Sequence, residues 1–272
     1  MSRKLASWLR DGLFALLALV FMLPLIWTVI GSFRGASTLR TEPWGLPEAL
    51  DWSNYVAAWE GKIGLYLLNS TIVTVIAVTV IIALSAPAAY AFARLRFSGS
   101  ELALGFILTG LLIPAHAVLI PLYQLNAALG VGDYLAIIGP YVAFGLPLSV
   151  LLLRAYFVEI PRELVEAAVI DGAGHLRILW TIFMPIARPA VATVAIFQAA
   201  WVWNELPFAL VFIQEGAHYT LPVGLLSFQG EHIANWGAIL AGVTIAVIPL
   251  MILYLVFQKH IVRGLTAGAV KE

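Results

Sequence analysis

Long apolar runs make up most of this chain, and the polar residues fall in short stretches between them. Five windows contain no Asp, Glu, Lys or Arg, and a sixth is interrupted only by Glu205. A bilayer core needs about 20 mostly apolar residues per helix, so these windows predict six membrane-spanning helices in an all-α integral membrane protein. The expected spans are Leu13–Ile30, Tyr66–Phe92, Leu102–Leu119, Leu135–Leu153, Ala190–Phe212 and Trp236–Phe257.

Composition supports a membrane protein and excludes several other classes. Hydrophobic residues are 62% and charged residues 11% of the 272 residues, against about 45–50% and about 25% in soluble domains. The formal net charge of zero leaves no basic field that would hold a nucleic acid. The chain has no Cys, which excludes disulfides and thiolate metal sites.

The distribution of basic residues predicts the orientation. With six spans both termini lie on one side, and 12 of the 15 Lys and Arg residues fall on that side. Because short basic loops stay in the cytoplasm, we expect cytoplasmic tails over 1–12 and 259–272 around a membrane domain over 13–258, in the bacterial or archaeal cell (inner) membrane. A cleavable signal peptide ending near Gly35–Ser37 is the alternative for the first span, but it would leave an odd number of spans.

The external loops give less specific signals. The first carries Trp44, Trp52, Tyr55 and Trp59, which fit either an interfacial aromatic belt or a protein-docking surface. The second, 120–134, is expected to be a short turn after Pro121. The third, 213–235, is rich in glycine and is expected to be irregular.

The cytoplasmic loop over 159–188 is long enough to hold helices of its own. Pro161 favours a helix start, Arg162–Ile170 continues it, and Asp171-Gly172 predicts a turn in which glycine has positive φ. We expect a second helix over about 173–183 that ends at Met184-Pro185. Such an amphipathic unit either rests on the membrane or docks to a cytoplasmic partner.

Within this loop the string EAAVIDGAGHLRILWTIFMP, Glu166–Pro185, resembles the EAA loop of the membrane subunits of bacterial ABC importers. The positions in register are Glu166, Ala167, Ala168, Gly172, Ile182 and Pro185, and Met184 replaces the usual Leu. Further strings, among them LLNSTIVT, AYAFARLRFSG, WNELPFAL and RGLTAGAVK, extend the resemblance over nearly the whole chain. They resemble carbohydrate-uptake permeases of the maltose-transporter G-subunit kind, which implies the type I importer permease fold.

The resemblance implies one half of a translocation pore in an ATP-driven sugar importer. Its implied partners are a second, homologous permease, two ATP-binding subunits, an extracytoplasmic solute-binding protein and membrane lipid. The residues implied to couple to the ATPase are Glu166, Ala167, Ala168, Asp171, Gly172, Ile182 and Pro185. The chain has no phosphate-binding loop of the Gly-x4-Gly-Lys-Ser/Thr type, so we expect ATP and Mg in the partner ATPase, and neither a cofactor nor an enzyme activity in this chain.

Polar residues within the spans are candidates for the substrate pathway. Glu205 lies beside Trp203, Asn204 and a helix-interrupting Pro207, and charge in hydrocarbon indicates a role or a cavity. Trp203, Asn204 and Glu205 are expected to line a sugar pathway. The alternative is that Glu205 and Asn204 form hydrogen bonds across a subunit interface. Asn69 belongs to a second polar cluster, for which helix-to-helix hydrogen bonding is the alternative. The five His residues match no metal-ligand spacing.

Two further alternatives concern cargo and class. Glycerol phosphate or another polyol derivative is the nearest other cargo. A secondary transporter should show repeated halves and several ionisable groups at the membrane midplane. Neither feature is evident in this sequence.

Overall fold

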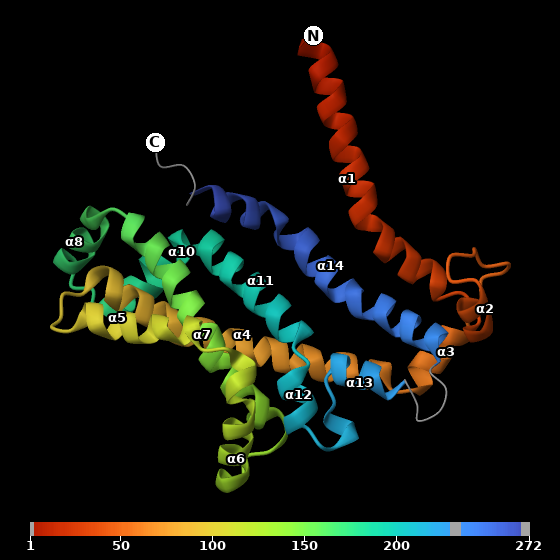
Figure 1. Ribbon diagram of the computed structural model, residues 1–272. Coiled ribbons are helices and arrows are strands. Elements are labelled where there is room, and N and C mark those ends of the chain that lie inside the picture. Colours follow the sequence, from red (N-terminus) through yellow and green to blue (C-terminus); the bar gives the residue numbers. More distant parts are fainter. Residues whose placement is uncertain (1–2, 229–234, 268–272) are drawn as a thin grey trace. The chain divides into compact units, whose positions relative to one another are not determined.

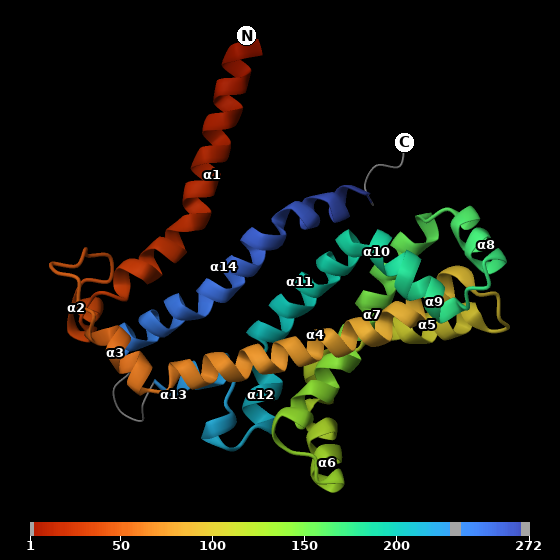
Figure 2. The same cartoon turned by 180° about the vertical axis from the view of Figure 1, so that it is seen from behind.

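The computed structural model describes residues 3–228 and 235–267, and every regular element in them is helical (Figure 1). Figure 2 shows the same elements from behind. In chain order they are α1 (Arg3–Gly31), α2 (Ala36–Thr41), α3 (Ser53–Glu60), α4 (Ile63–Arg94), α5 (Ser100–Thr109), η1 (Gly110–Leu112), η2 (Ala115–Val118), α6 (Leu119–Leu129), α7 (Asp133–Glu159), α8 (Arg162–Ile170), α9 (His175–Ile178), η3 (Leu179–Phe183), α10 (Met184–Ile186), α11 (Arg188–Asn204), α12 (Pro207–Phe212), η4 (Gly216–His218), α13 (Leu221–Ser227) and α14 (Trp236–Ala267).

Four of the expected spans coincide with single long helices. By length and composition, α1, α4, α7 and α14 are each able to cross a membrane. They contain the first, second, fourth and sixth expected spans. Two further helix pairs qualify only if each bent pair is counted as one span. The count of six therefore stays a prediction.

The third expected span, Leu102–Leu119, is not one helix. The chain runs from Ser100 to Leu112, turns by 91° and continues from Ala115 to Leu129. Pro114 lies at this bend, where it cannot donate a helical hydrogen bond. The turn expected after Pro121 is also wrong, because Pro121 lies in the first turn of α6, where a missing N–H costs nothing.

The fifth expected span, Ala190–Phe212, is divided into two helices just before Pro207, as this proline suggests. α11 ends at Asn204 and α12 begins at Pro207. At its other end α11 is preceded by an 81° bend, which separates it from the helical run His175–Ile186. Proline at the first position of α12 fits a helix start, because the N–H it lacks has no partner there.

The chain divides into two compact units, residues 1–65 with 224–249 and residues 66–223 with 250–272. In the first unit, buried Asn54 holds the loop after α1 by donating from Nδ2 to the carbonyls of Ser32 and Arg34, each at 2.9 Å. The Arg34 guanidinium in turn donates to the carbonyls of Glu42 at 2.7 Å and Pro43 at 3.3 Å. Trp44 and Trp52 remain exposed beside this loop.

The described residues of the second unit form two apolar clusters. One joins α4, α7, α11 and α12 and includes Val73, Tyr141, Val202 and Phe208. The other joins the C-terminal halves of α4 and α7 to the α8–α10 segment and to the start of α11. Helices α7 and α11 are also joined by the buried amide of Gln198, which donates to the carbonyl of Gly145 at 3.1 Å.

The close approach of helices at Gly145 gives a test of this packing. A Cβ added there would lie 2.5 Å from Ile81 Cδ1 and 2.9 Å from Gln198 Oε1, whereas at Gly139 on the same helix it would meet nothing within 4 Å. We expect Gly145→Ala to destabilise the protein by about 1–2 kcal/mol through overpacking. Gly139→Ala is the matched control and should be neutral or stabilising, since alanine favours helix. Unfolding in detergent measures both variants, and equal stability would contradict the packing.

Candidate functional site

The first short helix of the 159–188 loop has the bounds expected from the sequence. α8 begins directly after Pro161 and ends in a Schellman turn. There the Gly172 N–H donates to the Val169 carbonyl at 3.0 Å, and the Ala173 N–H donates to the Ala168 carbonyl at 2.9 Å. Gly172 has φ +76°, which confirms the positive φ expected at this turn.

α8 is held by a few small contacts and leaves most of its surface free. Ala168 is buried in the apolar cluster that joins α4 and α7 to the α8–α10 segment, and Val165 packs against the same cluster. Glu166 and Ala167 are exposed, and Ile170 is 85% exposed. Within this chain, α8 therefore presents a free face that carries both charged and apolar side chains.

The second helix of the loop departs from expectation. It runs from His175 to Ile186 without ending at Met184-Pro185. The five residues of η3 form a π-turn, in which the Met184 N–H reaches the Leu179 carbonyl five residues back. This wider turn accommodates Pro185, which lacks an N–H and would crowd the carbonyl four residues before it in a regular helix.

The loop is firmly attached to the ends of two long helices. Phe183 is fully buried, and its ring contacts Tyr90 of α4 at 4.9 Å and Phe157 of α7 at 5.3 Å, both edge to face. The Tyr90 hydroxyl forms a hydrogen bond of 3.1 Å with His175 Nδ1. These contacts make the α8–α10 segment continuous with the packing of α4 and α7.

An arginine completes this attachment. Arg94, the last residue of α4, donates from Nη2 to the carbonyls of Phe157 and Ile160 at the C-terminal end of α7. Its guanidinium also lies 5.3 Å from the centre of the Phe183 ring. A cation at a helix C-terminus satisfies free carbonyls and is favoured by the helix dipole.

Glu205, expected in a substrate pathway or at a subunit interface, has three hydrogen-bond partners within its own chain. Its side chain accepts hydrogen bonds from the Tyr141 hydroxyl at 2.5 Å and from the backbone N–H groups of Phe208 at 2.9 Å and Ala209 at 3.2 Å. With Pro207 lacking an N–H, the carboxylate satisfies the first free donors of α12. Glu205 thus caps the helix at the break between α11 and α12.

The other pathway candidates divide between interior and surface. Asn69 is buried and donates from Nδ2 to the carbonyls of Ala217 and Tyr219, each at 2.9 Å, so it fastens a loop. Trp203 is also buried. Asn204 is exposed, with its Nδ2 donating to the Ala200 carbonyl at 2.7 Å. Among these candidates Asn204 is exposed, whereas Asn69, Trp203 and Glu205 are buried within this chain. Their place in a substrate pathway stays a prediction.

One cluster could not be found from sequence spacing. Asp133, Glu215 and His218 come together at the surface, with His218 Nδ1 2.8 Å from Asp133 Oδ1 and 3.6 Å from Glu215 Oε2. The acid at 133 is distant in sequence from the other two, so no motif joins them. The contacts fasten the η4 turn to the start of α7.

Comparison with known proteins assigns the family. Residues 79–267 match the model for the binding-protein-dependent transport system inner membrane component. The chain belongs to this family. It is 38% identical over 249 residues to YurM of Bacillus subtilis, a probable ABC transporter permease protein, covering 91% of this chain and 83% of that one. It is 37% identical to the trehalose/maltose transport system permease protein of Thermococcus litoralis, covering 94% of both chains.

The fold of this permease is also that of a solved transporter. A chain in the crystal structure of a bacterial ABC transporter for import of the acidic polysaccharide alginate superposes with a TM-score of 0.81, at 26% identity over 95% of this chain and 98% of that one. The protein is therefore a multi-pass membrane permease of an ABC importer with the type I importer fold. As a binding-protein-dependent component it works with a solute-binding protein, an ATPase and a second permease.

The capping role of Glu205 in the permease leads to a stability prediction. Glu205→Ala leaves two backbone N–H groups and a buried hydroxyl without an acceptor, and should cost about 2–4 kcal/mol of unfolding free energy. Tyr141→Phe removes one bond and should cost about 1 kcal/mol. Glu101→Ala, at an exposed acid with no ion pair in the described residues, is the control. Denaturant unfolding in detergent measures the free energy of unfolding of each variant. A Glu205→Ala variant as stable as the Glu101→Ala control would rule out the cap.

Proposed function

We propose that this permease moves a neutral sugar into the cell as one half of a pore, driven by ATP hydrolysed on a separate subunit. The observation that carries the proposal is its similarity, along 94% of the chain, to a permease named for trehalose and maltose transport. Its partner is a second, homologous permease, and two ATP-binding subunits hold ATP and Mg beneath the pair. The excess of Lys and Arg in the cytoplasmic segments supports cytoplasmic termini.

Coupling to the ATPase is proposed to run through the α8–α10 segment. Its exposed face on α8 includes Glu166 and Ala167, where the small Ala side chain allows a partner to approach closely. Gly172 sets the bend after α8. Two further motif residues hold the segment in place, because Ala168 and Ile182 pack in the apolar cluster that attaches it to α4 and α7. Asp171 caps the end of α8 and Pro185 lies beyond the π-turn.

The sugar pathway is proposed to follow α7 and α11. A cavity of about 370 Å³ beside the bend near Pro114 is lined by the aromatic side chains of Phe144, Phe197 and Trp201 and by the amide of Gln198. Aromatic faces with a few polar groups suit sugar rings. Asn204, three residues after Trp201 on α11, extends this face. The residues that line the cavity include no Lys or Arg, which favours a neutral sugar over a phosphorylated polyol.

The energy source gives the first test. The complete transport complex in sealed vesicles, supplied with its solute-binding protein and labelled trehalose or maltose, should accumulate sugar only when ATP reaches the ATPase. The physical reason is that this chain lacks a phosphate loop and needs the partner for ATP. Accumulation driven by a proton or sodium gradient without ATP would contradict the proposal.

The bend after α8 gives the second test. A β-carbon added at Gly172 meets no atom within 4 Å, but it strains a backbone with φ +76° by about 1–2 kcal/mol or more. We expect Gly172→Val to leave the permease inserted and abundant while substrate-stimulated ATP hydrolysis and uptake collapse.

Gly174→Val is the matched control for this variant. Gly174 is two residues away, has φ −74° and also has open space around an added Cβ, so valine fits without strain. The control should transport normally. Equal uptake by the Gly172→Val and Gly174→Val complexes would show that the bend is not part of coupling.

A further inference from the structure

A cavity of about 760 Å³ lies between α8 and the hairpin that joins α4 to α5. Of the motif residues only Glu166 lines it, and the proposed sugar pathway does not include it. It is lined by Phe92, Ala93, Arg94, Leu95, Arg96, Phe97, Ser98, Ser100, Glu101, Arg162, Val165 and Glu166. Three arginines therefore line one cavity at the end of a membrane-spanning helix.

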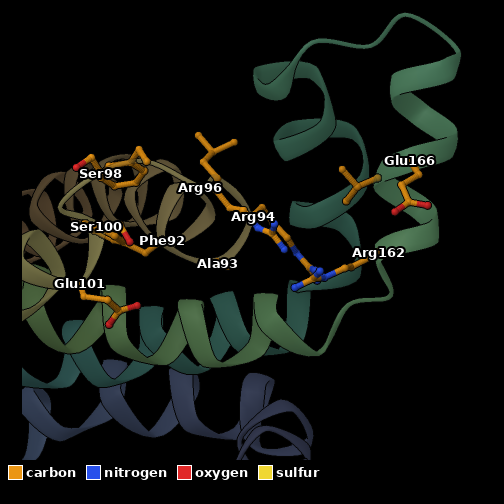
Figure 3. Close-up of a pocket in the computed structure, with 12 residues that line it drawn as sticks. Phe92, Ala93, Arg94, Arg96, Ser98, Ser100, Glu101, Arg162 and Glu166 are labelled. Atoms are coloured by element: carbon orange, nitrogen blue, oxygen red, sulfur yellow. The ribbon is translucent and has the colours of Figure 1, made fainter.

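The arginines lack acidic partners. Figure 3 shows the side chains of Arg94 and Arg162 reaching toward one another from α4 and α8, and their charges repel. Among the described residues none of the three arginines forms an ion pair, although Glu101 and Glu166 line the same cavity. The Nε of Arg94 is buried without a hydrogen-bond partner. Arginines that line one cavity without forming an ion pair favour an anion from outside the chain.

The surroundings of the cavity indicate which anion. Arg94 ends α4 and Ser100 begins α5, so the hairpin lies where a long apolar helix leaves the bilayer. Beside it, Leu102 and Phe106 on α5 are 82% and 80% exposed. A phospholipid has this combination of parts, because its phosphate suits arginines and its acyl chains suit an exposed apolar helix face. Basic pockets between helices on the cytoplasmic side are a recognised mode of binding anionic headgroups.

We propose that this cavity binds the headgroup phosphate of an anionic phospholipid, with Arg96 and Arg162 as its accessible cations and the acyl chains along Leu102 and Phe106. The choice of the cytoplasmic leaflet rests on the proposed topology. The site itself does not depend on which cargo is transported. A lipid bound here fills the space between α8 and the hairpin and stabilises the position of α8.

The test measures lipid retained by the assembled transport complex. Complexes are incubated in detergent with equal amounts of phosphatidylglycerol and phosphatidylcholine, purified again, and analysed for bound lipid by mass spectrometry. The wild type should be enriched in phosphatidylglycerol. The pair Arg96→Gln and Arg162→Gln should lower the affinity of the complex for phosphatidylglycerol about 25-fold, since each basic residue near an anionic surface contributes about fivefold.

Two control pairs make the result decisive. Arg177→Gln with Arg188→Gln removes the same charge from exposed positions outside the cavity and should retain phosphatidylglycerol. Arg96→Lys with Arg162→Lys keeps the charge and should retain more of it than the glutamine pair. The proposal is wrong if the Arg96→Lys and Arg162→Lys pair loses as much phosphatidylglycerol as the glutamine pair in the cavity. It is also wrong if the Arg177→Gln and Arg188→Gln pair loses that much.

Three other outcomes would also overturn it. Retention unchanged in the glutamine pair excludes the cavity as the lipid site. Loss of the ATPase subunits with retention unchanged means that a carboxylate of the ATPase fills the cavity. Displacement of the lipid by millimolar inorganic phosphate means that the site takes free phosphate. Transport is not measured, so a failure here leaves the proposed sugar import untouched, and a different cargo leaves the lipid result standing.

Discussion

A helix that ends within a bilayer must satisfy its free backbone groups from protein, because hydrocarbon offers neither donors nor acceptors. Two charged side chains meet this constraint in the permease. Glu205 accepts from the first N–H groups of α12, and Arg94 donates to the last carbonyls of α7. Their signs match the helix dipole, with the anion at an N-terminus and the cation at a C-terminus.

Much of the fold was predictable because its signals are local. Long apolar runs predicted α1, α4, α7 and α14, and Pro161 with Asp171-Gly172 predicted the bounds of α8. The errors concern prolines, whose effect depends on position within a helix. Pro114 breaks the third expected span, whereas Pro121 is accommodated in a first turn and Pro185 beyond a π-turn. The sequence shows where each proline lies in the chain, but it does not show how far that proline is from the first residue of a helix.

The capping role of Glu205 was missed for a different reason. An acid in a membrane span indicates function, but an acid two residues before a proline at the first helical position also fits a cap. The sequence Glu205-Leu206-Pro207 contained that signal. Tyr141, which supplies the third hydrogen bond, lies 64 residues earlier and could be placed only by the packing of α7 against α12. Long-range pairs of this kind leave no trace in local patterns.

The same packing explains how a surface loop can act on the spans. Ile178 and Phe183, at either side of the π-turn, are fully buried, so this turn cannot unwind without exposing them to water. Burying two such side chains is worth several kcal/mol. The α8–α10 segment therefore resists internal deformation, and Phe183 contacts both Tyr90 and Phe157. In the proposed coupling, a force applied by an ATPase at α8 would move the ends of α4 and α7 rather than deform the loop.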